Sequence, residues 1–137
     1  MTTFIEGLKA TAPLGLVLAM IAAVGLSLGL AKKRVQELNE HDLAQWRQQL
    51  AADRQNDADA FCLAVDYQKI GSLLAKLGRY QEAVDEYRHG LLIMELKLKG
   101  HPVLRDYYKG YLALLNDKSQ AEERARVRTK LAALPAF

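Results

Sequence analysis

The feature that most constrains this chain is a stretch of twenty residues without a charged side chain, from Ala12 to Ala31. An α-helix rises about 1.5 Å per residue, so a helix of this length spans about 30 Å, which matches the hydrocarbon core of a bilayer. Three cationic residues, 32–34, follow at once. The sequence therefore predicts a transmembrane helix over residues 12–31, preceded by a short N-terminal tail at residues 1–11.

Two other structures could contain such a segment. A buried helix of a soluble core is disfavoured, because a core of this size rarely encloses a helix that is apolar on every side. A cleaved signal peptide carries its positive charge before the apolar stretch, whereas here only Lys9 precedes it and three cations follow. By the positive-inside rule, the same asymmetry predicts a single-pass membrane protein with a cytoplasmic C-terminal domain. The membrane that we expect is a bacterial inner membrane.

The predicted membrane helix has two unlike faces. Large apolar side chains lie along one side, and small residues lie roughly opposite: Gly15, Ala19, Ala22, Gly25 and Gly29. Small residues let two helix backbones approach closely in lipid. We therefore expect this face to pack against another helix, in a homo-oligomer or in a larger complex. The alternative is that glycine and alanine are simply common in membrane helices.

The remainder of the chain predicts helices alone. Residues 32–56 lack glycine and proline, which favours a helical stalk that joins the following domain through Trp46 and Leu50. Within residues 57–137, apolar residues at helical spacing predict further helices over about 57–77, 80–98, 102–115 and 119–134. Gly78 and Gly100 would end two of them, and Ser119 with Glu122 would form a capping box. No segment alternates with period two, so the predicted fold class is all-α.

A repeat pattern lies within residues 67–91. Its positions are Tyr67, Gly71, Gly78, Tyr80, Ala83, Tyr87 and Gly90. Three of them are small where two antiparallel helices must touch, and we expect the three tyrosines to fill the space around them. Cys62 falls among apolar residues, and we expect it to be a small core residue rather than a nucleophile.

This pattern resembles a tetratricopeptide repeat (TPR), in the longer, roughly 42-residue form of kinesin light chains that ends here in Gly-His-Pro at residues 100–102. The resemblance implies a short array of antiparallel helix hairpins, with repeat one at about 61–101 and a degenerate repeat two at about 102–135. Two repeats are fewer than the three that usually make a free-standing array. The stalk helix or a partner could cap the array.

The resemblance implies binding rather than chemistry, through a concave surface formed by the first helix of each pair. The residues that it places on this partner groove are Gln68, Lys69, Ser72, Lys76, Lys109 and Asn116. Three lysines among them would suit an acidic partner segment. The alternative is that these are ordinary solvated residues on an exposed face.

The residues give no pattern for catalysis. The three histidines are scattered, and Glu86-x-x-His89 lacks the second such pair that a di-iron site needs. His101 is expected to serve the turn before Pro102. No phosphate-binding glycine loop is present, and a net charge of +3 gives no reason to invoke nucleic acid. We expect no enzyme activity, metal, cofactor or small-molecule substrate.

A group of cations lies near the C-terminus: Arg124, Arg126, Arg128 and Lys130. On a helix these residues divide between two sides, which favours a solvated surface. The alternative is contact with anionic lipid headgroups or with an acidic subunit.

These observations favour a structural or accessory subunit of a larger membrane complex. Its partners would be the lipid bilayer and either other membrane subunits or further copies of this chain. The alternative is a membrane-tethered adaptor that recruits a cytoplasmic partner through the repeat groove.

Overall fold

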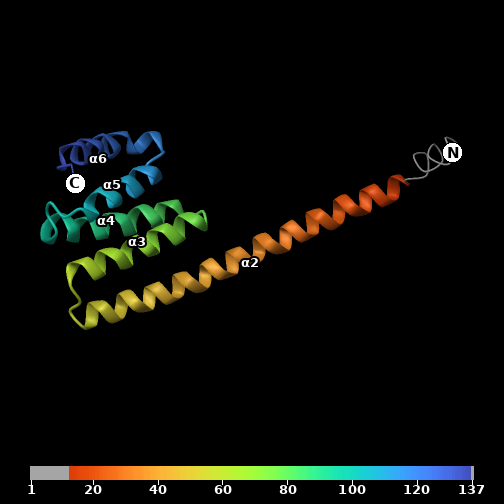
Figure 1. Ribbon diagram of the computed structural model, residues 1–137, viewed down its shortest axis with the longest axis horizontal. Helices are drawn as coiled ribbons and strands as arrows, with labels where there is room; N and C mark the ends of the chain where they lie inside the picture. The colour runs from red at the N-terminus through yellow and green to blue at the C-terminus, as the bar shows by residue number, and fades with distance from the viewer. Residues whose placement is uncertain (1–12, 137) are drawn as a thin grey trace. The chain divides into compact units, whose positions relative to one another are not determined.

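A computed structural model describes residues 13–136 of the chain. Within them it contains helices and no strand, as Figure 1 shows. The elements are α2 (Leu14–Gln55), α3 (Ala60–Lys76), α4 (Tyr80–Lys97), α5 (Val103–Leu114), the 3-10 turn η1 (Lys118–Gln120) and α6 (Ala121–Ala133). The all-α prediction is therefore confirmed. The expected N-terminal tail and Ala12 lie outside the described residues.

The described chain separates into two compact units, of which one ends at Leu38 and the other begins at Asn39. Helix α2 contributes residues 14–38 to the first unit and residues 39–55 to the second. The predicted stalk, residues 32–56, is thus divided between the two.

In the first unit, α2 is long and apolar enough to span a membrane. Every residue from Pro13 to Leu38 is exposed. Pro13 precedes the helix, and its carbonyl oxygen accepts from the N–H groups of Leu16 and Val17, at 2.8 and 3.4 Å. A proline at this position costs no hydrogen bond, since the first N–H groups of a helix have no partner within it.

In the second unit, α3 and α4 form a helix hairpin with a short connection. Asp59 caps α3, because its carboxylate accepts from the N–H of Cys62 at 2.8 Å. After α3 the chain turns at Gly78, whose φ of 77° lies in the left-handed region that glycine adopts without strain. Helix α3 ends where the sequence predicts, and it begins about three residues later than expected, after the Asp59 cap.

The hairpin packs tightly because small residues lie at its contacts. A methyl group added at Gly71 would lie 2.6 Å from the ring of Tyr87, and one added at Gly90 would lie 3.0 Å from the Cβ of Tyr67. Ala83 is fully buried. The prediction that these three positions are small where helices touch is confirmed.

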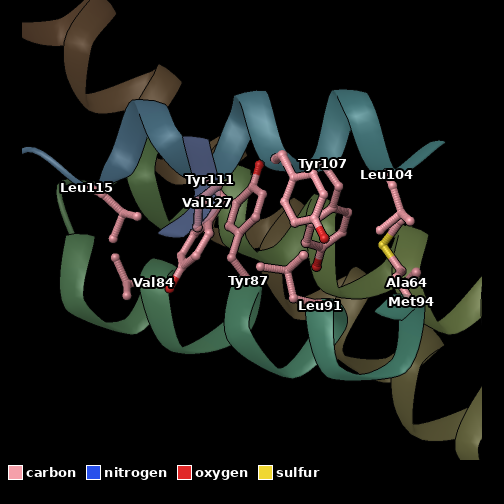
Figure 2. Packing of buried hydrophobic residues seen from close by; sticks show 11 residues of the cluster. Ala64, Val84, Tyr87, Leu91, Met94, Leu104, Tyr107, Tyr111, Leu115 and Val127 are labelled. Carbon is pink, nitrogen blue, oxygen red and sulfur yellow. The ribbon is translucent and has the colours of Figure 1, made fainter. Parts of the chain in front are cut away.

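Tyrosines form the centre of the core between α4 and α5. Tyr87 and Tyr107 meet edge to face with ring centroids 5.1 Å apart, and Tyr87 and Tyr111 stack at 5.9 Å. Figure 2 shows the three rings side by side between the two helices. Around them lie Val84, Leu91, Met94, Leu104, Leu115 and Val127.

The first helix of this unit is the end of α2, which packs on α3 through a second cluster. Leu43 is buried against Ile70 and Leu74, and Trp46 and Leu50 are partly buried beside it. The prediction that Trp46 and Leu50 join the stalk to the domain is confirmed. Leu43 completes the contact.

Helix α6 is attached by apolar contacts, with Val127 buried and Leu131 partly buried against the core, and by polar side chains. Arg88 on α4 donates from Nε to Glu123 at 2.9 Å, and the hydroxyl of Tyr111 donates to the same carboxylate. Lys130 and Tyr108 both donate to Glu95, at 2.8 and 2.9 Å. These links tie α6 to both helices before it.

Three local expectations are wrong. Tyr80 is 60% exposed rather than packed, because it borders an open hollow at the end of α5. Cys62 is exposed, since the first turn of α3 faces another hollow. The capping box before α6 joins Asp117 and Gln120 rather than Ser119 and Glu122, because a 3-10 turn precedes the α-helix.

Candidate interaction surfaces

The first candidate surface is the apolar part of α2. Leu14, Val24 and Leu28 are 58–77% exposed, and no side chain of the described chain covers them. On the opposite face, methyl groups added at Gly15, Gly25 or Gly29 would meet nothing within 4 Å. Ala19 and Ala22, the other residues predicted for this face, are also exposed. The space next to Gly25 and Gly29 is therefore open, and the exposed side chains of Leu18 and Leu26 border the same face.

The second candidate surface is a hollow of about 410 Å³ between α3 and α5. It is formed by Ser72 and Lys76 of α3, by Gly110 and Leu114 of α5, and by the edge of Tyr87 below them. Gly110 has no room for a side chain, since an added methyl group would lie 2.8 Å from the Tyr87 hydroxyl oxygen. The structure thus brings two of the six predicted groove residues together in one hollow.

The other predicted groove residues lie outside this hollow. Gln68 is half-buried and Lys69 exposed on the preceding turns of α3, and Lys109 is exposed beside Gly110. Asn116 borders a different hollow of about 380 Å³, and its side chain donates to the carbonyl oxygen of Ala113 at 2.9 Å. The six residues therefore do not line one continuous groove.

The charge of the α3–α5 hollow is positive. Lys76 is the one charged residue among those that line it. Burial raises the pKa of the Tyr87 phenol, so this group stays neutral at physiological pH. The hollow can accept a small apolar side chain next to a carboxylate.

A third hollow, of about 600 Å³, lies between α3 and residues 45–53 of α2. Trp46, Phe61 and Val65 form its apolar wall, and Asp53 and Asp66 its acidic wall. The sequence analysis did not single out these two carboxylates. The sequence does contain a sign of an unusual carboxylate, because Asp66 interrupts an apolar run in α3 and lies on the buried face of that helix.

Cys62 also borders this third hollow. The carboxylate of Asp59, which accepts from the Cys62 thiol, raises the pKa of that thiol. The thiol is therefore kept protonated, and a protonated thiol is a poor nucleophile. Although exposed, Cys62 has an environment opposite to that of a reactive cysteine.

The remaining residues singled out in the sequence do not gather into a site. Glu86 and His89 approach to 3.9 Å, and the described residues contain no group of three His, Cys, Asp or Glu that could hold a metal ion. His101 serves its turn as predicted, since its Nδ1 accepts from the N–H of Val103 at 3.1 Å. Lys130 is paired with Glu95, and Arg126 lies near it between α4 and α6.

Comparison with known proteins gives no relative: no family description matches the chain, and no curated sequence or solved structure is significantly similar to it. Any functional conclusion therefore depends on the surfaces described above.

Proposed function

We propose that this protein is a non-catalytic, membrane-anchored interaction subunit, and that it serves as a structural or accessory component of a larger membrane protein complex. The observation that carries the proposal is that every residue from 14 to 31 of α2 is exposed and uncharged. Burying one large apolar side chain is worth about 1.5–3 kcal/mol. Leaving so many exposed in water would drive aggregation, whereas a bilayer accommodates them.

The small-residue face of α2 supports assembly with another membrane helix. Lipid tails are as apolar as leucine, so helices associate in a bilayer mainly through close packing. Gly25 and Gly29 are spaced for such a contact, and the space next to both is open. The large apolar side chains on the opposite face, such as Val17 and Val24, would face lipid.

The second unit supports an interaction role rather than a catalytic one. Its hairpin has close contacts at Gly71, Ala83 and Gly90, which are the positions that the TPR resemblance assigns to packing. Such repeats bind proteins. Two hairpins give a short array, which suits a domain that is held among other subunits.

The proposed orientation places the second unit in the cytoplasm of a bacterial cell, because Lys32, Lys33 and Arg34 follow the apolar segment. A cysteine at an exposed position away from carboxylates provides a test, namely Lys99→Cys in a Cys62→Ser background, because Asp59 keeps the Cys62 thiol itself protonated. A membrane-impermeant maleimide should label it only after the inner membrane is opened. Labelling in intact spheroplasts would place the domain on the outer side.

The test of assembly is purification in mild detergent of a Gly25→Leu, Gly29→Leu double variant from the native membrane. We expect its co-purifying subunits, quantified by mass spectrometry, to fall at least tenfold. A Val17→Leu, Val24→Leu variant adds volume on the opposite face and should retain them. Equal recovery with both variants would show that the small-residue face is not the contact.

A membrane-tethered adaptor is the second candidate, and the α3–α5 hollow favours it. This hollow places Lys76 beside Ser72 and an apolar wall, which suits an acidic peptide. Charge reversal at Lys76 and Lys69 should weaken binding of a soluble cytoplasmic partner. The matched control is Lys97→Glu on α4, which should have no effect. Unchanged binding in the first variant would exclude the hollow as the recruitment site.

A further inference from the structure

The hollow between α3 and the end of α2 differs in character from the α3–α5 hollow. Its volume of about 600 Å³ lies within the roughly 300–1,000 Å³ typical of ligand pockets. Aromatic side chains border it from both helices, Trp46 from α2 and Phe61 from α3. None of the residues that line it is basic.

A buried carboxyl group lies in the wall of this hollow. Asp66 is 3% exposed, and its Oδ2 has no hydrogen-bond partner among the described residues. Asp53 faces it from α2 and is held there by Gln49, whose Nε2 donates to the Asp53 carboxylate at 2.9 Å. A buried acceptor without a partner is costly, and a natural core rarely retains one without a reason.

The Asp53 and Asp66 carboxyl groups are so close that the ionisation of one disfavours the ionisation of the other. Burial, followed by the effect of the neighbouring Asp53 carboxylate, raises the pKa of Asp66 to about 7. Two carboxylates side by side cannot both ionise readily unless a proton or another cation lies between them. Within residues 13–136 no cationic side chain borders the hollow, so the pair can accept a cation from outside.

We propose that this hollow is a binding site for an organic cation, an alkylammonium or guanidinium group on an apolar stem. The cation would lie between Asp53 and Asp66, where it satisfies the unpaired oxygen. The stem would lie against Trp46 and Phe61, whose ring faces also attract cations. The site is independent of membrane anchoring and of the α3–α5 hollow, so it stands whether or not the proposed function holds.

The same chemistry is found in a lysine or arginine side chain of a partner protein and in a free alkylamine. An open hollow on the surface of a helix pair admits either. A partner polypeptide would gain additional contacts along the rim, where Phe61 is 43% exposed. A free amine would bind through the ammonium group and stem alone.

Trp46 provides the measurement, because it is the single tryptophan of the chain and borders the hollow. The full-length protein in detergent micelles is titrated at pH 8 with three probes: acetyl-Leu-Lys-Leu-amide, the same peptide with norleucine in place of lysine, and pentylamine. We expect saturable changes in Trp46 emission with the cationic probes and none with the norleucine peptide. Tighter binding of the lysine peptide than of pentylamine would identify a polypeptide source, and equal binding a free amine.

The variant Asp66→Asn keeps the shape of the side chain and removes its charge. We expect it to raise the half-saturation concentration at least tenfold, with an unchanged helical circular dichroism spectrum. Asp106→Asn removes an equal charge at an exposed position on α5 and should bind as the original protein does. Asp53→Asn should also weaken binding, since the cation lies between the two carboxylates.

The proposal is overturned by any of three results. The first is an equal response to the lysine and norleucine peptides. The second is the absence of any saturable response to the cationic probes. The third is identical titration of the original protein and Asp66→Asn.

Discussion

Gly90→Ala would test the close approach of α4 and α5. In an exposed helix interior, alanine is more favourable than glycine by about 1 kcal/mol. At this position an added Cβ would instead overlap the hydroxyl oxygen of Tyr107, and it would lie 2.7 Å from the Cζ of that residue. Tyr107 is 1% exposed and the neighbouring Tyr67 is 7% exposed, so neither ring can move into solvent.

The expected change in the free energy of unfolding is the cost of overpacking minus the gain in helix propensity. Overpacking a buried site costs about 1–3 kcal/mol, and an overlap with a buried ring belongs at the upper end. After subtraction of the gain in helix propensity, Gly90→Ala should lower the free energy of unfolding by about 2 kcal/mol. The assay is urea unfolding of the full-length protein in micelles, followed by the fluorescence of Trp46.

A second substitution makes the test specific. Tyr107→Phe removes the overlapping hydroxyl group, which is buried without a hydrogen-bond partner among the described residues. Alone it should raise stability by about 1 kcal/mol, and in combination it should recover part of the loss from Gly90→Ala. If Gly90→Ala is stabilising by the same amount in both backgrounds, helix propensity alone governs the position and the packing argument is refuted.

Three further outcomes are expected. Gly78→Ala should lower the urea midpoint by the equivalent of about 1 kcal/mol, because alanine is strained at a φ of 77°. Asp117→Ala should cost about 1 kcal/mol in the same assay through loss of the cap, whereas Ser119→Ala should not. Glu123→Gln should cost about 1 kcal/mol at pH 7, discounted for the exposed Arg88. Because Arg88 lowers the pKa of Glu123, this difference should persist above pH 4.5 and disappear in thermal melts as the pH falls well below it.

Much of the fold could be predicted from the sequence because its signals are local. A glycine that must adopt a left-handed conformation, such as Gly78, marks a helix end wherever the chain folds. Apolar residues at helical spacing mark the buried face, and small residues such as Gly71 and Gly90 mark the places where helices touch. Each of these signals is read from residues close together in the sequence, without knowledge of which distant segment packs against them.

The remaining features depend on contacts between distant segments. Tyr80 shares the repeat pattern with Tyr87, but α5 ends before it could cover Tyr80, so the side chain is exposed. Asp66 and Asp53 come together only because the end of α2 packs on α3. No spacing within either helix could indicate that pairing. The six predicted groove residues were carried over by resemblance, which does not specify where a short array ends.

The attachment of α6 has a consequence for how the domain opens. Cooperative units with few buried contacts exchange their amide protons first. Salt weakens the charged links of α6 but not its apolar contacts through Val127 and Leu131. Hydrogen exchange in α6 should therefore be faster than in α3 and α4, and it should accelerate at high ionic strength. The free energy of local opening would then differ between helices, and it would be lowest in α6. Its C-terminal helix would be the element that can leave while the α3–α4 hairpin remains closed.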